Sequence, residues 1–287
     1  MANLKEIRNR ISSVESTMQI TSAMKMVSAA KLKRAQDAIV QLRPYADKLT
    51  EILVNLSSTL DGADGNEFSS ERELKNILFV SITSNRGLCG GFNSNIIKQT
   101  TSLINNEYKD ANASIVSIGK KSSEHFSKKG YNVLSSHDDL YNEITFEAVA
   151  DIAENIMKTF IDGEFDKVVL VYNQFKNAAT QIVMSENYLP VETPQDENAT
   201  IGDYIFEPSK EEIVQELIPK SLKTQLFKAI LDSHASEHGA RMTAMHKATD
   251  NANDLKDDLT LFYNKARQAA ITGEILEIVG GAEALND

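Results

Sequence analysis

The sequence contains one cysteine, five prolines and no tryptophan among its 287 residues. Cys89 has no second cysteine to pair with, so an intrachain disulfide is excluded, which fits a reducing compartment. The low proline content permits long uninterrupted helices. No apolar run approaches the length of a membrane span, and the first residues lack an apolar signal core. The sequence therefore predicts a protein that is soluble when made and reaches a membrane only through a partner.

The charge is acidic overall but unevenly distributed. The net charge of −11 argues against general nucleic-acid binding. Residues 1–43 nevertheless contain eight basic residues against three acidic ones. Such a basic arm suits an acidic partner surface, although an ordinary solvated helix would also account for it. Hydrophobic residues make up 41% of the chain, which is enough for a packed core.

Both ends of the chain have the apolar spacing of a coiled coil. Over residues 3–58, which contain no glycine, strict 3–4 spacing predicts a helix roughly 80 Å long, bent or locally broken at Pro44. Its seam comprises Leu4, Ile7, Ile11, Val14, Met18, Thr21, Lys25, Ser28, Leu32, Ala35, Ile39, Leu42, Ala46, Leu49, Leu53 and Leu56. The helical period returns from about Glu211, with Pro219 near a helix start or a kink. The second seam comprises Leu231, Ala235, His238, Met242, Met245, Thr249, Ala252, Leu255, Leu259, Phe262, Ala266, Ala269, Gly273 and Leu276.

The middle of the chain alternates short apolar runs with helical patterns. Residues 60–72 read as a loop, and strands are expected at 76–83, 114–118, 131–135, 167–175, 181–189 and 204–206. Helices are expected at 94–108, 120–129 and 145–160, and residues 190–210 as an acidic loop. This order predicts a Rossmann-like α/β domain at 73–208, inserted into an antiparallel coiled coil of helices 1–59 and 211–287. The 3.5-residue period predicts a left-handed supercoil.

The predicted rod has more apolar surface than two helices can bury. Thr21, Lys25 and Ser28 interrupt the first seam, so either Lys25 points outward or this stretch faces more than its partner helix. Off the seam lie Ile20, Ala23, Met24, Met26, Val27, Ala29 and Ala30, and the second helix repeats the pattern with Met242, Ala244, Met245, Ala266, Ala269, Ala270 and Ile271. Apolar residues around much of a helix indicate burial on several sides, so we expect a partner to surround the rod.

Three features could indicate an active or metal site. The turn Ser84–Asn93 lies between a strand and a helix, where phosphates bind, but it matches neither GxxxxGK[ST] nor GxGxxG, so a packing turn is favoured. Cys89 has no histidine near it in sequence and is better explained as a buried residue. His234 and His238 lie i,i+4, but with no clear third ligand we interpret them as packing or surface residues.

Three segments resemble one family along the whole chain. Lys5–Gln36 (KEIRNRISSVESTMQITSAMKMVSAAKLKRAQ), Arg86–Asn93 (RGLCGGFN) and the stretch from SEHGARMTAMHKATDNA to GGAEAL are similar to the gamma subunits of F-type ATP synthases. The resemblance implies a non-catalytic shaft with no cofactor or metal of its own. The shaft turns inside a ring of three alpha and three beta subunits, and the insert binds the epsilon subunit and the c-ring. Proton flow would drive rotation, and catalysis would stay on beta.

The resemblance also implies contact residues and a location. Met24 and Lys25 match the contact with an acidic lever of beta, which Lys31, Lys33 and Arg34 would suit. Arg241, Gln268, Thr272 and Glu274 match contacts with a catch loop of beta, although the residues taken alone would favour plain helix surface. Plastid members carry an inserted cysteine pair. Cys89 alone therefore predicts a bacterial-type member without thiol regulation, on the cytoplasmic face of the cell membrane.

Two other functions are compatible with parts of the sequence. One is a nucleotide-binding enzyme built on the insert, which tight ATP binding by the isolated chain would favour. The other is a coiled-coil scaffold or chaperone with an α/β partner-binding domain, which self-association through the seams would favour. Neither accounts for the three matching segments.

Overall fold

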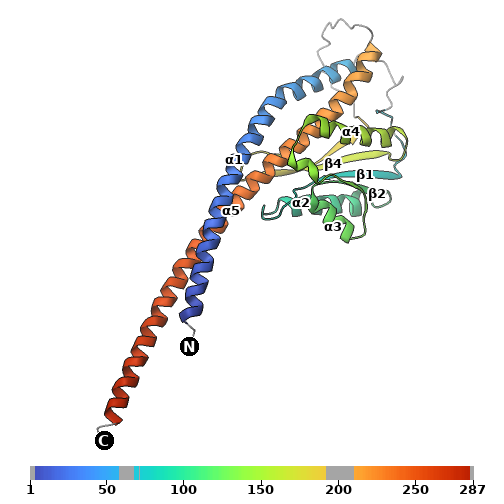
Figure 1. Cartoon of the computed structure of the whole chain (residues 1–287). Coiled ribbons are helices and arrows are strands. Elements are labelled where there is room, and N and C mark those ends of the chain that lie inside the picture. Colours follow the sequence, from blue (N-terminus) through green and yellow to red (C-terminus); the bar gives the residue numbers. More distant parts are fainter. Residues whose placement is uncertain (1–3, 58–67, 71, 192–209, 285–287) are drawn as a thin grey trace. The chain divides into compact units, whose positions relative to one another are not determined.

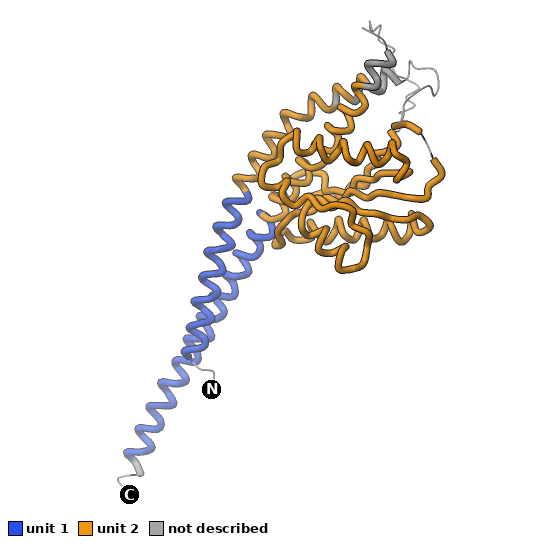
Figure 2. The backbone as a smooth tube through the Cα atoms, turned by 45° about the vertical axis from the view of Figure 1, so that its right-hand side comes forward, with its two compact units in different colours: residues 1–28, 242–287 blue, residues 29–241 orange. Residues whose placement is uncertain are grey.

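The computed structural model describes residues 4–57, 68–70, 72–191 and 210–284, and it divides into two compact units. The rod combines residues 1–28 with residues 242–287, and the main unit comprises residues 29–241 (Figure 2). Two long helices, α1 (Leu4–Ser57) and α5 (Lys210–Ala284), each contribute to both units. The units thus divide within these helices, whereas the sequence suggested domain boundaries at the helix ends.

Both long helices form as the sequence predicts, and neither is broken by its proline. Residues stay helical through Pro44 in α1 and through Pro219 in α5. The seam predicted for α1 is buried at Ile7, Leu32, Ala35, Ile39, Ala46 and Leu49. The side chains of Leu53 and Leu56 lie outside the described residues.

Within the rod, α1 and α5 run antiparallel. Arg8 lies over the ring of Tyr263, 6.0 Å from its centroid, and Glu15 accepts a hydrogen bond from Lys256 at 3.1 Å. Further along, the hydroxyls of Thr21 and Thr249 are 2.8 Å apart. Residue numbers rise on one helix as they fall on the other, and the register between the two helices stays constant.

The seam predicted for the last part of α5 is right at Leu259 and Ala266, which are partly buried, but it is wrong by one position at Leu255 and Phe262. These two side chains are about half exposed. Lys256 and Tyr263 face α1 instead, as their contacts with Glu15 and Arg8 show. Apolar residues occupy several faces of this helix, so the 3–4 spacing of apolar residues does not by itself identify the face that meets α1.

The main unit contains a five-stranded sheet in the order β3-β2-β1-β4-β5 (Figure 1). All neighbours pair in parallel except β4 and β5, which are antiparallel, so the predicted mixed sheet is confirmed. The strands are β1 (Asn76–Ile82), β2 (Asn112–Ile118), β3 (Asn132–Ser136), β4 (Lys167–Phe175) and β5 (Gln181–Leu189).

Helices cover both faces of this sheet. One face packs on α4 (Phe146–Ile161) and on the part of α5 that includes Leu226, and the other on α2 (Phe92–Ser102) and α3 (Lys120–Lys128) (Figure 1). The buried side chains of β1 alternate between these two cores, with Val80 in the first and Phe79 in the second. Strands buried on both faces read as continuous apolar runs, which is why the sequence locates them well.

The remaining predictions have mixed outcomes. The helix expected at 94–108 is α2 followed by a π-helical turn, η1 (Leu103–Glu107), and a 3-10 turn, η2 (Asp139–Asn142), precedes α4. Most of the loop at 60–72, the acidic loop at 190–210 and the strand at 204–206 fall outside the described residues.

The middle of α5 is enclosed on nearly every side within the main unit. Nearly every residue from 231 to 241 is buried, and the exception, His234, is partly buried. At Gly239 a Cβ atom would lie 3.2 Å from the Cα and the carbonyl oxygen of Ala178, in the β4–β5 turn. Glycine therefore allows that turn to approach the helix closely.

Candidate partner interface

One face of α1 in the rod is apolar and exposed. Ile20 is 60% exposed, Met26 65% and Val27 58%, whereas Thr21 and Ser28 on the opposite side are buried against α5. A helix that is apolar on the side away from its partner helix has further apolar surface to bury. The surface expected from the sequence is thus present, and no described residue of the rod covers it.

Met24 and Lys25 lie at the edge of the α1–α5 seam, each partly buried. The Lys25 amine is 3.3 Å from Nδ1 of His246 on α5. The side chain is only partly buried and its contact with His246 is exposed to solvent, which reduces the desolvation that a buried amine would suffer. The interruption at Lys25 is therefore accommodated without breaking the register.

The last part of α5 presents both predicted contact residues and apolar side chains. Gln268, Thr272 and Glu274 are all exposed, and the Thr272 hydroxyl donates to the Gln268 carbonyl at 2.9 Å. Exposed apolar neighbours are Ile271, Ile275, Leu276, Ile278 and Val279. In the rod this end of α5 continues past the first residues of α1 (Figure 2). Its apolar side chains thus lack a covering helix among the described residues of the rod.

The basic residues expected to meet an acidic partner are exposed on α1 in the main unit. Lys31, Lys33 and Arg34 all face solvent. Lys33 pairs with Asp37 at 2.8 Å, an exposed i,i+4 ion pair of small energetic value. The positive charge of this face is therefore only partly neutralised within the chain.

Arg241 differs from the other five predicted contact residues because it is buried in the main unit. Its guanidinium forms an ion pair with Glu237 one turn earlier and donates hydrogen bonds to the carbonyls of Gly87 and Arg86. The structure thus connects Arg241 to the glycine turn. Sequence analysis did not identify Glu237, although its i,i+4 spacing from Arg241 on a helix was a usable signal.

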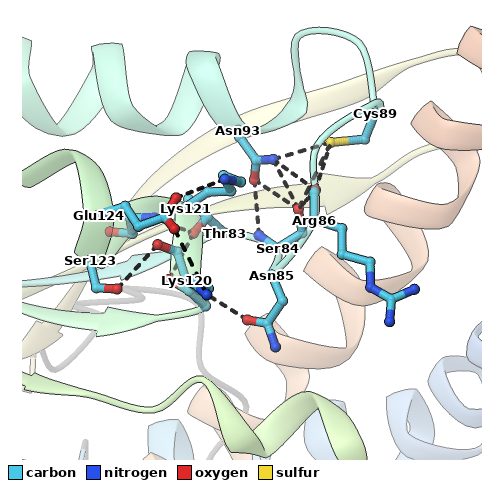
Figure 3. A network of polar contacts seen from close by, with 12 residues as sticks. Thr83, Ser84, Asn85, Arg86, Cys89, Asn93, Lys120, Lys121, Ser123 and Glu124 are labelled. Atoms are coloured by element: carbon cyan, nitrogen blue, oxygen red, sulfur yellow. Dashed lines mark hydrogen bonds and ion pairs between the residues drawn. The ribbon is translucent and has the colours of Figure 1, made fainter.

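The glycine turn is held together by its own polar groups (Figure 3). The Asn93 carboxamide accepts from the amide of Ser84 at 2.9 Å and donates to the Ser84 hydroxyl at 2.9 Å. At the start of α3, the amide of Lys120 donates to Asn85 Oδ1 and that of Lys121 to the Ser84 carbonyl. These amides belong to α3 rather than to α2, the helix that follows the turn. Helix N-terminal amides of this kind can bind a phosphate, and here the chain itself satisfies them.

A cleft of about 460 Å³ opens beside α4, near the end of β3. Four carboxylates line it, those of Asp138, Asp139, Glu143 and Asp151. Carboxylates repel the phosphates of a nucleotide, so this cleft does not favour the nucleotide-binding alternative either.

His234 and His238 pack against each other inside the main unit. Their rings meet edge to face with centroids 4.5 Å apart, and neither ring nitrogen of His238 has a hydrogen-bond partner among the described residues. Burial lowers the pKa of His234 to about 4 and that of His238 to about 3. Among the described residues, no group of three or more metal-ligating side chains forms. The two rings pack together in their neutral form, with His238 buried and His234 partly buried.

Two further buried groups are perturbed by their surroundings. Burial raises the pKa of the Cys89 thiol, and Cys89 packs with Phe92 and Ala240, in line with its interpretation as a small apolar residue. Asp232 is 1% exposed, and burial raises its pKa to about 6 although Arg43 and Lys228 favour its charged form. Among the described residues, neither Asp232 oxygen has a partner with hydrogen-bond geometry, but the nearby backbone amide of Phe175 favours the charged carboxylate.

The chain matches one protein family over nearly its whole length. The family model described as ATP synthase matches residues 3–285. The chain is 64% identical over 287 residues to the ATP synthase gamma chain of Flavobacterium johnsoniae and 61% identical over 286 residues to that of Christiangramia forsetii. Both alignments cover 100% of this chain and 100% of the relative.

Solved structures of ATP synthases have the same fold. A chain of the Tetrahymena thermophila mitochondrial ATP synthase central stalk and c-ring is 26% identical, with a TM-score of 0.59, over 80% of this chain and 99% of that one. A chain of the Euglena gracilis mitochondrial ATP synthase is 24% identical, with a TM-score of 0.71, over 98% of this chain and 94% of that one.

Sequence, family model and fold therefore agree. No helix among the described residues is long and apolar enough to cross a membrane. The site residues found here are surfaces and packing groups rather than a set of reacting side chains. On the family match and the full-length identity with named relatives, the chain belongs to the family of ATP synthase gamma chains.

Proposed function

We propose that this gamma chain works as the central rotor shaft of an ATP synthase, turning inside a ring of alpha and beta subunits. It is a non-catalytic subunit, and ATP is made or hydrolysed on beta. The epsilon subunit and the c-ring bind at the insert, so proton flow through the membrane sector turns the chain. Its place is the cytoplasmic face of the bacterial cell membrane, where the complex holds it.

One observation carries this proposal. The rod exposes apolar side chains on both helices, at Ile20, Met26 and Val27 and again from Ile271 to Val279, on faces that the rod itself leaves uncovered. A solvent-facing coiled coil needs only an apolar seam, whereas a shaft enclosed by a ring is apolar around its circumference.

The two rod helices expose different residues at each level, so the surface of the shaft is asymmetric. A ring of three beta subunits meets a different part of this surface at each site, and rotation changes which site meets which part. Only contacts that differ between conformations can shift their populations. The shaft therefore imposes a different conformation on each catalytic site in turn.

Individual residues have distinct parts in this proposal. Met24 and Lys25, with the exposed Lys31, Lys33 and Arg34, face an acidic segment of beta, where opposite charge favours contact. Gln268, Thr272 and Glu274 contact a second loop of beta from the uncovered end of α5. Arg241 contributes through its position on the glycine turn, since its guanidinium is committed within the chain.

The general test is ATP hydrolysis by purified alpha and beta subunits from the same source, with and without this chain. We expect one copy per ring and a rise in multi-site turnover. A chain that neither joins the ring nor changes turnover would remove the shaft proposal.

A sharper prediction concerns Thr272, for which the same helix supplies a matched control. Thr272→Ala in the assembled complex should lower turnover about fivefold or more, because truncating one of the few interface residues that carry the binding energy costs more than ~1 kcal/mol. Thr260→Ala should leave turnover unchanged. Both hydroxyls are exposed and donate to the carbonyl four residues earlier, at 2.9 Å for Thr272 and 2.7 Å for Thr260. Equal turnover in the two variants would exclude Thr272 from the interface.

A further inference from the structure

A buried ion pair links the shaft helix to the glycine turn. The side chains of Glu237 and Arg241, one turn apart on α5, are each 10% exposed. The Arg241 guanidinium donates from Nη2 to the Glu237 carboxylate and to the carbonyl of Arg86, and from Nη1 to the carbonyl of Gly87. A planar guanidinium with several donors can hold a carboxylate and two carbonyls in one fixed geometry.

The glycine turn that accepts hydrogen bonds from Arg241 has an unusual backbone conformation. Leu88 directly follows the two residues whose carbonyls accept these bonds, has a φ of 62°, and is 68% exposed. A non-glycine residue in the left-handed region costs about 1–2 kcal/mol and persists only where the surroundings impose it. The hydrogen bonds from Arg241 are an external constraint on this turn.

Other contacts connect the same stretch of α5 to the sheet. The Ser236 hydroxyl donates to the carbonyl of Asn173 at 3.0 Å, and the Asn173 carboxamide donates to the carbonyl of Phe92 at 3.2 Å. The close approach of Ala178 at Gly239 lies on the same stretch. The helix is thereby held at two points of the insert, the glycine turn and the end of β4.

The ion pair is better explained by geometry than by stability. A buried pair seldom stabilises a fold more than apolar residues of the same volume would, because desolvation offsets the attraction. An apolar pair could not donate directional hydrogen bonds to two carbonyls, as Arg241 does. A rotating shaft transmits torque between its parts, and torque tends to displace a helix along a purely apolar contact. Directional hydrogen bonds between the helix and the turn resist that displacement.

We propose that Glu237 and Arg241 form the joint through which torque passes between the insert and α5, with Glu237 as the positioning residue that orients Arg241 on the glycine turn. This inference rests on the proposed shaft function. In this proposal Arg241 contributes to coupling through contacts within this chain rather than through contacts with beta.

The test combines hydrogen exchange on the full chain with coupling in the assembled complex, using Glu237→Gln. Without the carboxylate, Arg241 loses its orientation, and the hydrogen-bonded amides at the two ends of the turn, those of Ser84 and Phe92, should exchange at least about tenfold faster. Protons pumped per ATP hydrolysed should fall several-fold while the complex still assembles. Arg241→Lys keeps the positive charge but lacks the planar guanidinium, and it should show the same faster exchange and weaker coupling. This second variant tests the proposal if Glu237→Gln fails to fold.

The control is Glu124→Gln, which removes an exposed ion pair of α3 with Lys121 at 2.7 Å and should change neither readout. Unchanged exchange at the Ser84 and Phe92 amides in both variants would overturn the joint, and so would normal coupling despite faster exchange. Failure of the shaft proposal gives a different result, because the wild-type chain itself would then not enter the ring. The exchange experiment would still test whether Glu237 orients Arg241 on the glycine turn.

Discussion

Replacing Gly119 by alanine should prevent the main unit from folding stably, with a loss of at least about 4 kcal/mol in the free energy of unfolding. Gly119 has a φ of 98°, and an added Cβ would lie 2.2 Å from the carbonyl oxygen of Thr83. Both residues follow adjacent strands at the centre of the sheet, where the Thr83 amide donates to the Ile118 carbonyl at 2.8 Å. Neither backbone segment can move without breaking that pairing.

Urea unfolding of the full chain measures this effect, with Gly130→Ala as the matched control. Gly130 also has a positive φ, 79°, but nothing lies within 4 Å of its Cβ position. Its alanine variant should lose only the backbone strain, ~1–2 kcal/mol. Equal losses in the two variants would show that the overlap with Thr83 is relieved by a small shift.

His238→Leu should make the chain more resistant to acid. Burial lowers the pKa of His238 from 6.5 to about 3, so the ring stays neutral in the folded chain over a range where the unfolded chain takes up a proton. Its contribution to stability is complete above pH 6.5 and is lost as the pH falls toward 3, at about 1.4 kcal/mol per pH unit. At pH 4.5 the variant should therefore gain roughly 2–3 kcal/mol over the wild type, relative to pH 7.5.

The pH trend is measured as the difference in unfolding free energy between variant and wild type at each pH. In this difference the contributions of the other titrating groups cancel. This matters because Asp232, whose pKa is raised to about 6, loses its stabilising effect in the opposite direction, as the pH rises from 4 to 6. His246→Leu is the control, since the His246 side chain is 57% exposed in the folded chain. A flat difference curve for His238→Leu would mean that water reaches the imidazole.

The contact residues were predictable to different degrees. Gln268, Thr272 and Glu274 are exposed, whereas Arg241 is buried against the glycine turn. A linear motif records which residue types belong together, and it does not distinguish a side chain that meets a partner from one that holds another part of the same chain. Asp232 and Gly239 were missed because neighbours such as Phe175 and Ala178 are distant in sequence, whereas Glu237 had a local signal in its spacing from Arg241.

The sequence by itself determined the elements of this protein and its family. The 3–4 spacing located α1 and its seam at Ile7 and Ile39, and continuous apolar runs located strands buried on both faces, because both signals are local and repeat many times. Tertiary structure decided which face of α5 meets α1 beyond Ala252, where Lys256 packs inward and Leu255 outward. It also decided how α5 is held to the insert, because that depends on the close approach of segments that no periodic pattern connects.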